Sequence, residues 1–423
     1  MTETSAAPTQ GADRWWEDGQ VMKRFVCDLI VADLRTLRPS SSRLPALPWE
    51  PTLHISRELD VDSLELLSLA SSLAEAIHLH ESGIEDYLLA RPTIQDWAVI
   101  AQTGLQEFSA TLTFRTSGST GLAKPCTHPL DHLQQEIREL TPLFAGRRRI
   151  FSAVPSHHIY GFLFTILLPR ALSLSNDHVV DVRGSSPAGL ARVLSEGDLV
   201  VAHPDFWRAV TRSMPAIPPG VIGVTSTAPC ADEVSAALEA GGLSQLFQIY
   251  GSSETAGVGW RASASSPYKL FSFWKKANVE GSELIRTAPD AKRVVHYCQD
   301  RLEWISPVEF RVIGRVDDVV QVGGSNVSPQ KVRTILMQYP DVVDAAVRLM
   351  HASEGSRLKA FIVVRNQSSN PTMLHGQLEE WVNTRLSAPE RPKSFTFGHQ
   401  LPQGASGKDA DWLITADARF RDG

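Results

Sequence analysis

The stretch TSGSTGLAKP at residues 116–125 has the composition of a phosphate-binding loop. Its glycines expose backbone NH groups, and its hydroxyls and lysine add further donors and a positive charge, which are the groups that bind a polyphosphate. The stretch is not a Walker A loop, because that motif places Ser or Thr directly after the lysine, whereas Pro125 follows Lys124. A polar surface turn is the alternative interpretation. The residues expected to contact phosphate are Thr116, Ser117, Gly118, Ser119, Thr120, Gly121 and Lys124.

Further segments downstream gather polar, aromatic or glycine residues in short clusters. They are HHIYG at 157–161, TSTAP at 225–229, IYGSSE at 249–254, Asp300 before an apolar strand, GRVDDVVQVGGSNVSP at 314–329 and LPQGASGK at 401–408. Together with the loop at 116–125, these segments and their order resemble the adenylate-forming superfamily of acyl- and aryl-CoA synthetases, peptide-synthetase adenylation domains and luciferases. The resemblance covers the chain from about residue 111 onward. It implies ATP-dependent conversion of a carboxylic acid to acyl-AMP and pyrophosphate, followed by attack of a thiol.

The resemblance assigns four charged residues to the nucleotide and its metal ion. Glu254 would bind Mg²⁺, which requires hard oxygen ligands where it bridges phosphates. Asp300 would accept hydrogen bonds from the ribose hydroxyls, with Arg315 as a second ribose contact. Lys408 would lie between the carboxylate and the α-phosphate and neutralise the charge that builds up in the transition state. The other implied nucleotide contacts are Thr227, Ala228, Pro229, Tyr250, Gly251, Ser252 and Ser253.

The same resemblance implies where the acid and the thiol bind. The residues expected to line the acid pocket are His158, Tyr160, Gly161, Ala256 and Gly257. His158 is also a candidate catalytic residue, and a core histidine is its alternative interpretation. Asp317 would be the hinge about which the small domain rotates between the two half-reactions. Gly323 and Gly324 would line the thiol tunnel, because glycine lets a ligand approach the backbone closely.

An aryl acid such as 4-hydroxybenzoate is the expected substrate. The run at 314–329 is especially similar to that of benzoate-type ligases, and SSETAGVGWR at 252–261 resembles the AMP ligases found with bacterial aryl polyene and xanthomonadin pigment synthesis. Tyr160 and Phe162 offer flat apolar walls that suit an aromatic ring. A fatty or 3-hydroxyacyl chain is the alternative, because the motifs do not define the depth of the pocket.

The segment LDVDSLELLSLASSLAEAI at 59–77 resembles the second helix of acyl carrier proteins, whose DSL serine receives phosphopantetheine. Two interpretations of Ser63 are open. In the first, Ser63 carries a pantetheine arm that brings the accepting thiol to the adenylate. In the second, the DSL triplet is a helix cap in front of a leucine-rich face.

The fold class expected from these patterns is α/β, an adenylate-forming fold in three parts. Residues 1–104 would form a small all-helical, carrier-protein-like unit. Residues 105–314 would form a large α/β domain that binds AMP and is truncated relative to the family. Residues 315–423 would form a small, mobile α+β domain. These lengths suit the two to four domains that roughly 100 to 200 residues per domain allow for 423 residues.

Hydrophobic spacing predicts the individual elements. The expected helices lie near residues 25–34, 62–77, 87–89, 93–100, 187–194, 233–238 and 372–386. The expected strands of the small domain lie at residues 342–350, 358–365 and 394–397.

The composition excludes several classes of protein. The net charge of −6, from 41 basic and 47 acidic residues, offers no attraction to nucleic acid or to an anionic membrane, so neither is an expected partner. The most apolar window, at 150–174, is interrupted by Pro, His and Arg, so no membrane-spanning helix is expected. No secretory signal is expected either. The four isolated cysteines indicate reduced thiols, and the expected location is the cytoplasm.

The principal hypothesis is therefore a ligase that uses ATP and Mg²⁺, with CoA or the phosphopantetheine of an acyl carrier protein as the thiol acceptor. A phosphate-loop NTPase is disfavoured by the absence of the Walker A pattern. A non-catalytic carrier or binding protein with a degenerate ligase fold is disfavoured by the presence of Glu254, Asp300 and Lys408.

Overall fold

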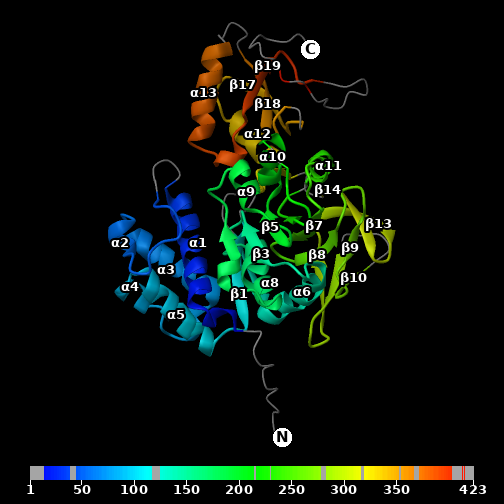
Figure 1. The fold of residues 1–423 in the computed structure, drawn as a ribbon. Coiled ribbons are helices and arrows are strands. Elements are labelled where there is room, and N and C mark those ends of the chain that lie inside the picture. The colour runs from blue at the N-terminus through cyan, green and yellow to red at the C-terminus, as the bar shows by residue number, and fades with distance from the viewer. Residues whose placement is uncertain are drawn as a thin grey trace. The chain divides into compact units, whose positions relative to one another are not determined.

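The computed structural model describes residues 14–38, 44–116, 124–213, 216–228, 230–277, 283–315, 319–351, 354–365, 371–402, 412 and 414 (Figure 1). The chain forms two compact units. Unit 1 contains Met1–Thr116, Pro125–Cys298 and Glu303–Arg311, and unit 2 contains Ser117–Lys124, Gln299–Leu302 and Val312–Gly423.

The described residues at the start of unit 1 are helical, coloured blue to cyan in Figure 1. The elements are a 3₁₀ turn at Trp15–Glu17, α1 (Gly19–Leu37), α2 (Ile55–Glu58), α3 (Ser63–Ile77), a 3₁₀ turn at Leu79–Glu81, α4 (Tyr87–Ala90) and α5 (Ile94–Glu107). Asp62 caps α3, because its carboxylate accepts hydrogen bonds from the backbone NH groups of Leu64 and Glu65 (2.9 and 2.8 Å). The Glu65 side chain in turn accepts from the NH of Asp62, which completes a capping box. The helices predicted near 25–34, 62–77, 87–89 and 93–100 are confirmed.

A parallel sheet forms the centre of unit 1. Its parallel strands are β3 (Arg149–Ser152), β4 (Val179–Asp181), β5 (Asp198–Ala202), β6 (Ile222–Thr225) and β7 (Gln245–Ser252). Every residue of β5 and β6 is buried, as expected for strands covered on both faces. Beyond β7 the sheet continues through antiparallel neighbours, giving the order β13-β14-β9-β8-β7-β6-β5-β3-β4.

The remaining strands of that order are β8 (Ala256–Arg261), β9 (Tyr268–Leu270), β13 (Asp300–Ser306) and β14 (Glu309–Arg315). Two smaller sheets accompany it. One pairs β1 (Thr111–Thr116) with β2 (Lys124–Pro129), and the other joins β10 (Trp274–Lys276), β11 (Glu283–Thr287) and β12 (Arg293–Tyr297).

Helices connect the strands and cover the sheet. They are α6 (Leu130–Leu143), α7 (Ile159–Phe162), a π-helical turn at Leu163–Leu167, α8 (Leu168–Ala171), a 3₁₀ turn at Asn176–His178, α9 (Pro187–Val193), α10 (Pro204–Ser213) and α11 (Asp232–Ala240). Leu190, Trp207 and Leu238 from α9, α10 and α11 pack in one buried cluster with Val200 of β5 and Leu246 of β7. The helices predicted near 187–194 and 233–238 are confirmed as α9 and α11.

The helical segment and the sheet share a hydrophobic core. Phe162 of α7 makes edge-to-face contacts with Trp15 (ring centroids 4.9 Å apart), Phe25 (6.1 Å) and Phe114 (5.4 Å). Residues on both sides of the boundary predicted at 104/105 therefore belong to one compact unit. The second predicted boundary, at 314/315, lies close to Val312, where unit 2 resumes.

Unit 2 contains a small α+β fold. Its elements are β15 (Val320–Val322), β16 (Ser325–Val327), α12 (Pro329–Met337), β17 (Val342–Leu349), β18 (Leu358–Val364), α13 (Pro371–Asn383), a 3₁₀ turn at Ala388–Glu390 and β19 (Ser394–Gly398). β18 is the central strand of a three-stranded sheet, antiparallel to β17 and parallel to β19. Leu378 of α13 and Leu336 of α12 are fully buried against this sheet. The three strands and the helix predicted for this region are confirmed.

Candidate functional site

Three of the predicted motifs follow parallel strands of the sheet in unit 1. HHIYG at 157–161 follows β3, TSTAP at 225–229 begins at the last residue of β6, and IYGSSE at 249–254 contains the end of β7. The carboxyl ends of parallel strands meet at one edge of a sheet, and in open α/β sheets ligands bind outside that edge. The fold therefore brings these three motifs to the same edge of unit 1.

The loop after β3 carries His157 and His158. The side chain of His158 is solvent-exposed, yet desolvation by the surrounding protein lowers its pKa, and nearby Asp28 opposes this. The ring of His157 lies beside it, with the two centroids 4.1 Å apart. The solvent-accessible surface of this crowded side chain favours the pocket interpretation over the core-histidine alternative. The lowered pKa favours a neutral imidazole at pH 7.

Tyr160 and Gly161 have packing roles at the start of α7. The Tyr160 side chain is buried, and its hydroxyl donates to the carbonyl oxygens of Ala202 (3.2 Å) and Val224 (2.9 Å), at the carboxyl ends of β5 and β6. A Cβ on Gly161 would lie 1.8 Å from the carbonyl oxygen of Pro155, so only glycine allows α7 to approach the preceding loop. These contacts fix the direction in which the chain leaves the His158 loop.

The predicted metal ligand Glu254 lies on the tight turn between β7 and β8. The Ser252 hydroxyl accepts hydrogen bonds from the backbone NH groups of Glu254 and Thr255 (both 3.2 Å). The Glu254 side chain is exposed, so its carboxylate is accessible to a cation. The turn is also held from β2, where Nε2 of His128 donates to the carbonyl oxygen of Ser253 (2.6 Å). Burial lowers the pKa of His128 to about 4, so this donor is neutral at pH 7.

A buried carboxyl group on α6 supports the same turn from the interior. Glu136 is fully buried, and its Oε2 accepts a hydrogen bond from the backbone NH of Gly257 (2.8 Å). Its Oε1 has no hydrogen-bond partner among the described residues. Burial raises the pKa of Glu136 to about 7, against the opposing effects of the Gly257 NH and of Arg286.

Arg286 of β11 belongs to this buried group of side chains. Its guanidinium donates to the carbonyl oxygens of His132 (2.7 Å) and Thr255 (3.3 Å) and lies over the ring of Phe273, 4.5 Å from the centroid. Burial lowers the pKa of Arg286 to about 10. The indole NH of Trp274 donates to the carbonyl oxygen of Gly257 (2.8 Å). The turn that carries Glu254 therefore rests on buried polar groups with several hydrogen bonds.

Glu136→Gln is expected to reduce the pH dependence of the free energy of unfolding. Because the pKa of Glu136 is raised from its ordinary 4.5 to about 7, the folded state holds the proton more tightly than the unfolded chain. The stability of the natural protein should therefore fall as pH rises between these values, by about 3 kcal/mol at most. Glutamine cannot ionise, so urea unfolding from about pH 5 to about pH 8 should show the variant losing less stability. Glu139→Gln, on the same helix, is the control and should leave the profile unchanged, whereas identical profiles for Glu136→Gln and the natural protein would contradict the assignment.

The TSTAP segment contains a strained residue. Thr227 has φ +77°, in the left-handed region that β-branched side chains rarely adopt. The preceding Ser226 is held by a hydrogen bond from its hydroxyl to the carbonyl oxygen of Ile249 (3.0 Å). Strained backbone persists where neighbouring contacts determine it, and it is common at ligand sites.

Thr227→Gly is expected to raise the free energy of unfolding by about 1 kcal/mol, because relief of backbone strain outweighs the extra entropy of glycine in the unfolded chain. Thr225→Gly, two residues earlier in the buried strand β6, is the matched comparison and should lower stability. Chemical denaturation of both variants measures the difference. A loss of stability in Thr227→Gly would show that the threonine side chain makes contacts that exceed the strain.

The glycine pair of unit 2 forms the turn between β15 and β16. Val322 pairs with Ser325, and the two residues between them, Gly323 and Gly324, both have positive φ (+58° and +81°). Positive φ at both central positions is the requirement of a type I′ hairpin turn. The turn alone thus explains both glycines, and both are exposed.

Other predicted nucleotide residues lie at or near the ends of strands. Lys124 is exposed at the start of β2, and Asp300 is half-buried at the start of β13. Tyr250 is half-buried near the end of β7, where its ring contacts Phe310 (centroids 5.3 Å apart). Several predicted residues lie outside the described part of the chain, namely Ser117, Gly118, Ser119, Thr120, Gly121, Pro229, Asp317 and Lys408, and the side chains of Thr116 and Arg315 are also outside it.

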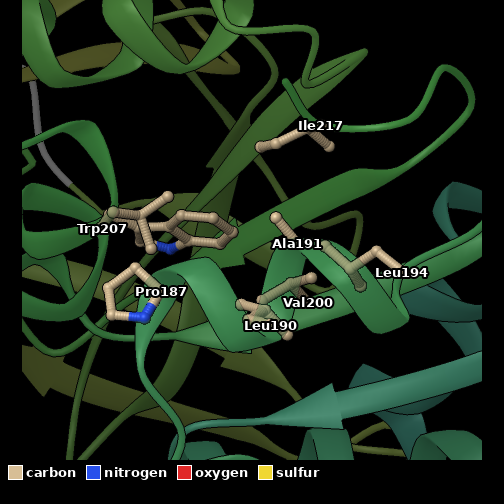
Figure 2. Close-up of a pocket in the computed structure, with 8 residues that line it drawn as sticks. Pro187, Leu190, Ala191, Leu194, Val200, Trp207 and Ile217 are labelled. Atoms are coloured by element: carbon tan, nitrogen blue, oxygen red, sulfur yellow. The ribbon is translucent and has the colours of Figure 1, made fainter. Parts of the chain in front are cut away.

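Two hollows in unit 1 do not coincide with the predicted site. Figure 2 shows an apolar pocket among α9, β5 and α10, lined by Pro187, Leu190, Ala191, Leu194, Val200, Trp207, Val210 and Ile217. Its volume of about 10 Å³ is the space of about one water molecule, too little for a carboxylic acid. A larger hollow of about 540 Å³ lies along β10 and includes Lys275, Lys276 and Trp304.

Within the described residues, no three His, Cys, Asp or Glu side chains are grouped so that they could hold a metal ion. Mg²⁺ in phosphate-transfer sites is usually held by one or two carboxylates together with substrate phosphates, and an exposed Glu254 fits that arrangement. The described part of the chain also contains no helix with both the length and the apolar character needed to cross a membrane.

Comparison with known proteins identifies the family. Residues 331–408 match the AMP-binding enzyme C-terminal domain. The chain is 35% identical to a 4-coumarate–CoA ligase of Rhodobacter capsulatus over 407 residues, which cover 93% of this chain and 100% of that protein. It is 38% identical to a 4-coumarate–CoA ligase of Halorhodospira halophila over 347 residues, covering 82% and 87%. The chain belongs to the adenylate-forming aryl-CoA ligases, and it is an AMP-forming acid–thiol ligase.

Solved structures support the fold. The amide bond synthetase McbA of Marinactinospora thermotolerans is similar with a TM-score of 0.59 and 15% identity, covering 95% of this chain and 98% of that one. A malonyl-CoA ligase bound to methylmalonyl-CoA and AMP is similar with a TM-score of 0.54 and 20% identity, covering 69% and 71%. At these identities the likeness shows the adenylate-forming fold alone.

Sequence patterns did not reveal the buried supports of the site. His128, Glu136 and Arg286 carry no motif, and the partners of His128 and Glu136 lie more than a hundred residues away along the chain. A charged residue on the apolar face of a helix, such as Glu136 on α6, is a signal that could have indicated a buried role.

Proposed function

We propose that this ligase activates a 4-hydroxylated aromatic acid, with 4-coumarate as the first choice, and transfers the acyl group to CoA. The observation that carries the proposal is the similarity along nearly the whole chain to proteins named 4-coumarate–CoA ligase, at 35–38% identity. The sequence expectation of 4-hydroxybenzoate stays as the second candidate. It is supported by 23% identity over 393 residues to a 4-chlorobenzoate–CoA ligase of Arthrobacter.

The arrangement of unit 1 suits the first half-reaction. His158 follows β3, Thr227 follows β6, and Tyr250 and Glu254 lie near the end of β7 and just beyond it. All four are at the carboxyl edge of the sheet, where ligands bind in open α/β folds. Mg²⁺, when bound, would neutralise charge on the phosphates of ATP, and Glu254 is the residue that would hold it. His158, neutral and exposed, would border the acid at the same edge.

CoA is the proposed thiol acceptor, as in the names of the relatives. Ser63 is exposed at the first position of α3, while the capping of that helix is performed by Asp62. Within the DSL triplet, the residue that caps the helix is therefore Asp62 and not Ser63. Incubation with a phosphopantetheinyl transferase and CoA, followed by intact mass measurement, tests the carrier alternative directly. An unchanged mass supports free CoA.

Acid-dependent exchange of labelled pyrophosphate into ATP tests the proposed substrate. The acids to compare are 4-coumarate, 4-hydroxybenzoate, cinnamate and a medium-chain 3-hydroxy fatty acid, followed by thioester formation with CoA. The highest kcat/KM is expected with 4-coumarate, and a lower value with cinnamate, since a site that hydrogen-bonds a hydroxyl rejects the analogue that lacks it. A clear preference for the fatty acid, or absence of exchange with every aromatic acid, would overturn the proposal.

A further inference from the structure

A buried aspartate of the first long helix is bonded to the loop that carries His158. Asp28 lies on α1, and its side chain is only 2% exposed. Its Oδ2 accepts two hydrogen bonds from Ser156, one from the backbone NH and one from the hydroxyl, both 2.7 Å long. Ser156 lies two residues before His158. A residue of the helical segment thus anchors a loop that is 128 residues away in sequence.

The charge of Asp28 is balanced by an arginine from a third segment. Nη1 of Arg183 lies 2.6 Å from Oδ1 of Asp28, and the same arginine pairs with Asp181 at the end of β4. A buried carboxylate is costly unless it is paired and hydrogen-bonded, and removal of its partners leaves that cost uncompensated. The three segments are therefore held together where β3 and β4 end.

A second residue of α1 forms hydrogen bonds with the chain that follows the same loop. Arg24, one helical turn before Asp28, donates to the carbonyl oxygen of Thr165 (2.6 Å) and to Oδ1 of Asn176 (2.9 Å). Thr165 lies in the π-helical turn that follows α7, and such turns are frequent at functional sites. Positions four apart lie on one face of a helix. One face of α1 therefore fastens the chain both before and after His158.

We propose that Asp28 is a positioning residue for the acid substrate, and that it acts by fixing the loop at 155–158 so that His158 borders the bound acid. The inference rests on the proposed function, since it takes His158 as part of the acid site. Asp28 itself does not contact the substrate. Its effect is on geometry, and a displacement of about 1 Å at a reacting site can cost up to about a hundredfold in rate.

Asp28→Asn tests this inference, because asparagine has the same shape but loses the charge that pairs with Arg183. The KM for the acid is expected to rise at least about tenfold in pyrophosphate exchange, while the KM for ATP changes less than about twofold. Hydrogen–deuterium exchange should also become faster in the peptide that contains residues 153–162. Arg183→Gln should also raise the KM for the acid, and this variant replaces Asp28→Asn as the test if Asp28→Asn does not fold.

Asp198 offers a closely matched control. Its side chain is 1% exposed, it accepts a hydrogen bond from the backbone NH of Ser195 (2.7 Å), and it pairs with Arg149 (2.7 Å). It lies at the amino end of β5, on the opposite edge of the sheet from the motifs. Asp198→Asn should cost stability like Asp28→Asn but leave the KM for the acid unchanged.

Equal KM values for the acid in Asp28→Asn and the natural protein would overturn the inference. An equal rise in KM for the acid in Asp28→Asn and Asp198→Asn would also overturn it. Failure of the proposed function is distinguishable, because then the natural protein itself would show no exchange with any aryl acid.

Discussion

Lys408→Ala is expected to lower acid-dependent pyrophosphate exchange by at least about a hundredfold, while the thioester still forms from CoA and acyl-AMP supplied ready-made. A lysine between the carboxylate and the α-phosphate stabilises charge that appears only in the adenylation transition state. The family resemblance also implies that the small domain rotates between the half-reactions, so that Lys408 is withdrawn when the thiol attacks. The ratio of the two rates is therefore the quantity to measure, by exchange for the first step and by chromatography of the thioester for the second.

The described residues on either side of Lys408 in the sequence pack on one sheet of unit 2. Trp412 is buried against Phe361 of β18 (centroids 5.6 Å apart), and Leu401 packs on the same cluster. The ammonium group of the fully buried Lys359 donates to the carbonyl oxygen of Trp412 (2.5 Å) and to Glu354 (2.8 Å). Both flanks are thus attached to one sheet of unit 2.

Lys393→Ala is the matched control for Lys408→Ala. Lys393 is an exposed lysine just before β19, and its replacement should leave both half-reactions unchanged. Equal losses in the two half-reactions of Lys408→Ala would contradict a role confined to adenylation.

Glu254→Gln is expected to reduce pyrophosphate exchange by about a hundredfold and to raise the Mg²⁺ concentration needed for half-maximal rate. The substitution keeps the size of the side chain and removes its charge. The hydrogen bonds of the turn involve the backbone of Glu254 and the side chains of Ser252 and Thr255, so the turn itself should be preserved. The loss is therefore electrostatic.

Glu239→Gln, at an exposed position of α11, controls for the loss of one negative charge and should not change the Mg²⁺ requirement. An Mg²⁺ titration of exchange for the natural protein and both variants gives the comparison. An unchanged Mg²⁺ requirement in Glu254→Gln would remove Glu254 from the metal site.

Local signals in the sequence were sufficient for most elements. The capping residues of the DSL triplet indicated the start of α3, and the apolar run at 358–365 indicated β18, because both signals depend on neighbouring residues. The order of the motifs along the chain, together with the carboxyl-edge rule for parallel strands, explains why HHIYG, TSTAP and IYGSSE follow neighbouring strands.

Contacts between residues far apart in the sequence could not be predicted from those local signals. The hydrogen bond between Glu136 and Gly257 joins residues 121 positions apart, and nothing near either residue indicates the other. Tyr160 was expected to be a pocket wall, and nothing in the sequence indicated that its hydroxyl donates to the carbonyl oxygens of Ala202 and Val224. The contacts of Phe162 with Trp15 and Phe25 were not predictable for the same reason, since an amphipathic helix does not reveal what it will pack against.

The shared core of α1 and α7 limits how this chain can have changed by recombination. A gene fusion that exchanged residues 1–104 for another helical domain would remove the ring contacts of Phe162 with Trp15 and Phe25. It would also remove the ion pair between Asp28 and Arg183. The loop at 155–158 would then lose its anchor although its own codons were untouched. Residues 28 and 156 are therefore expected to covary among homologous sequences. The helical segment is expected to be exchanged between homologues only together with the sheet.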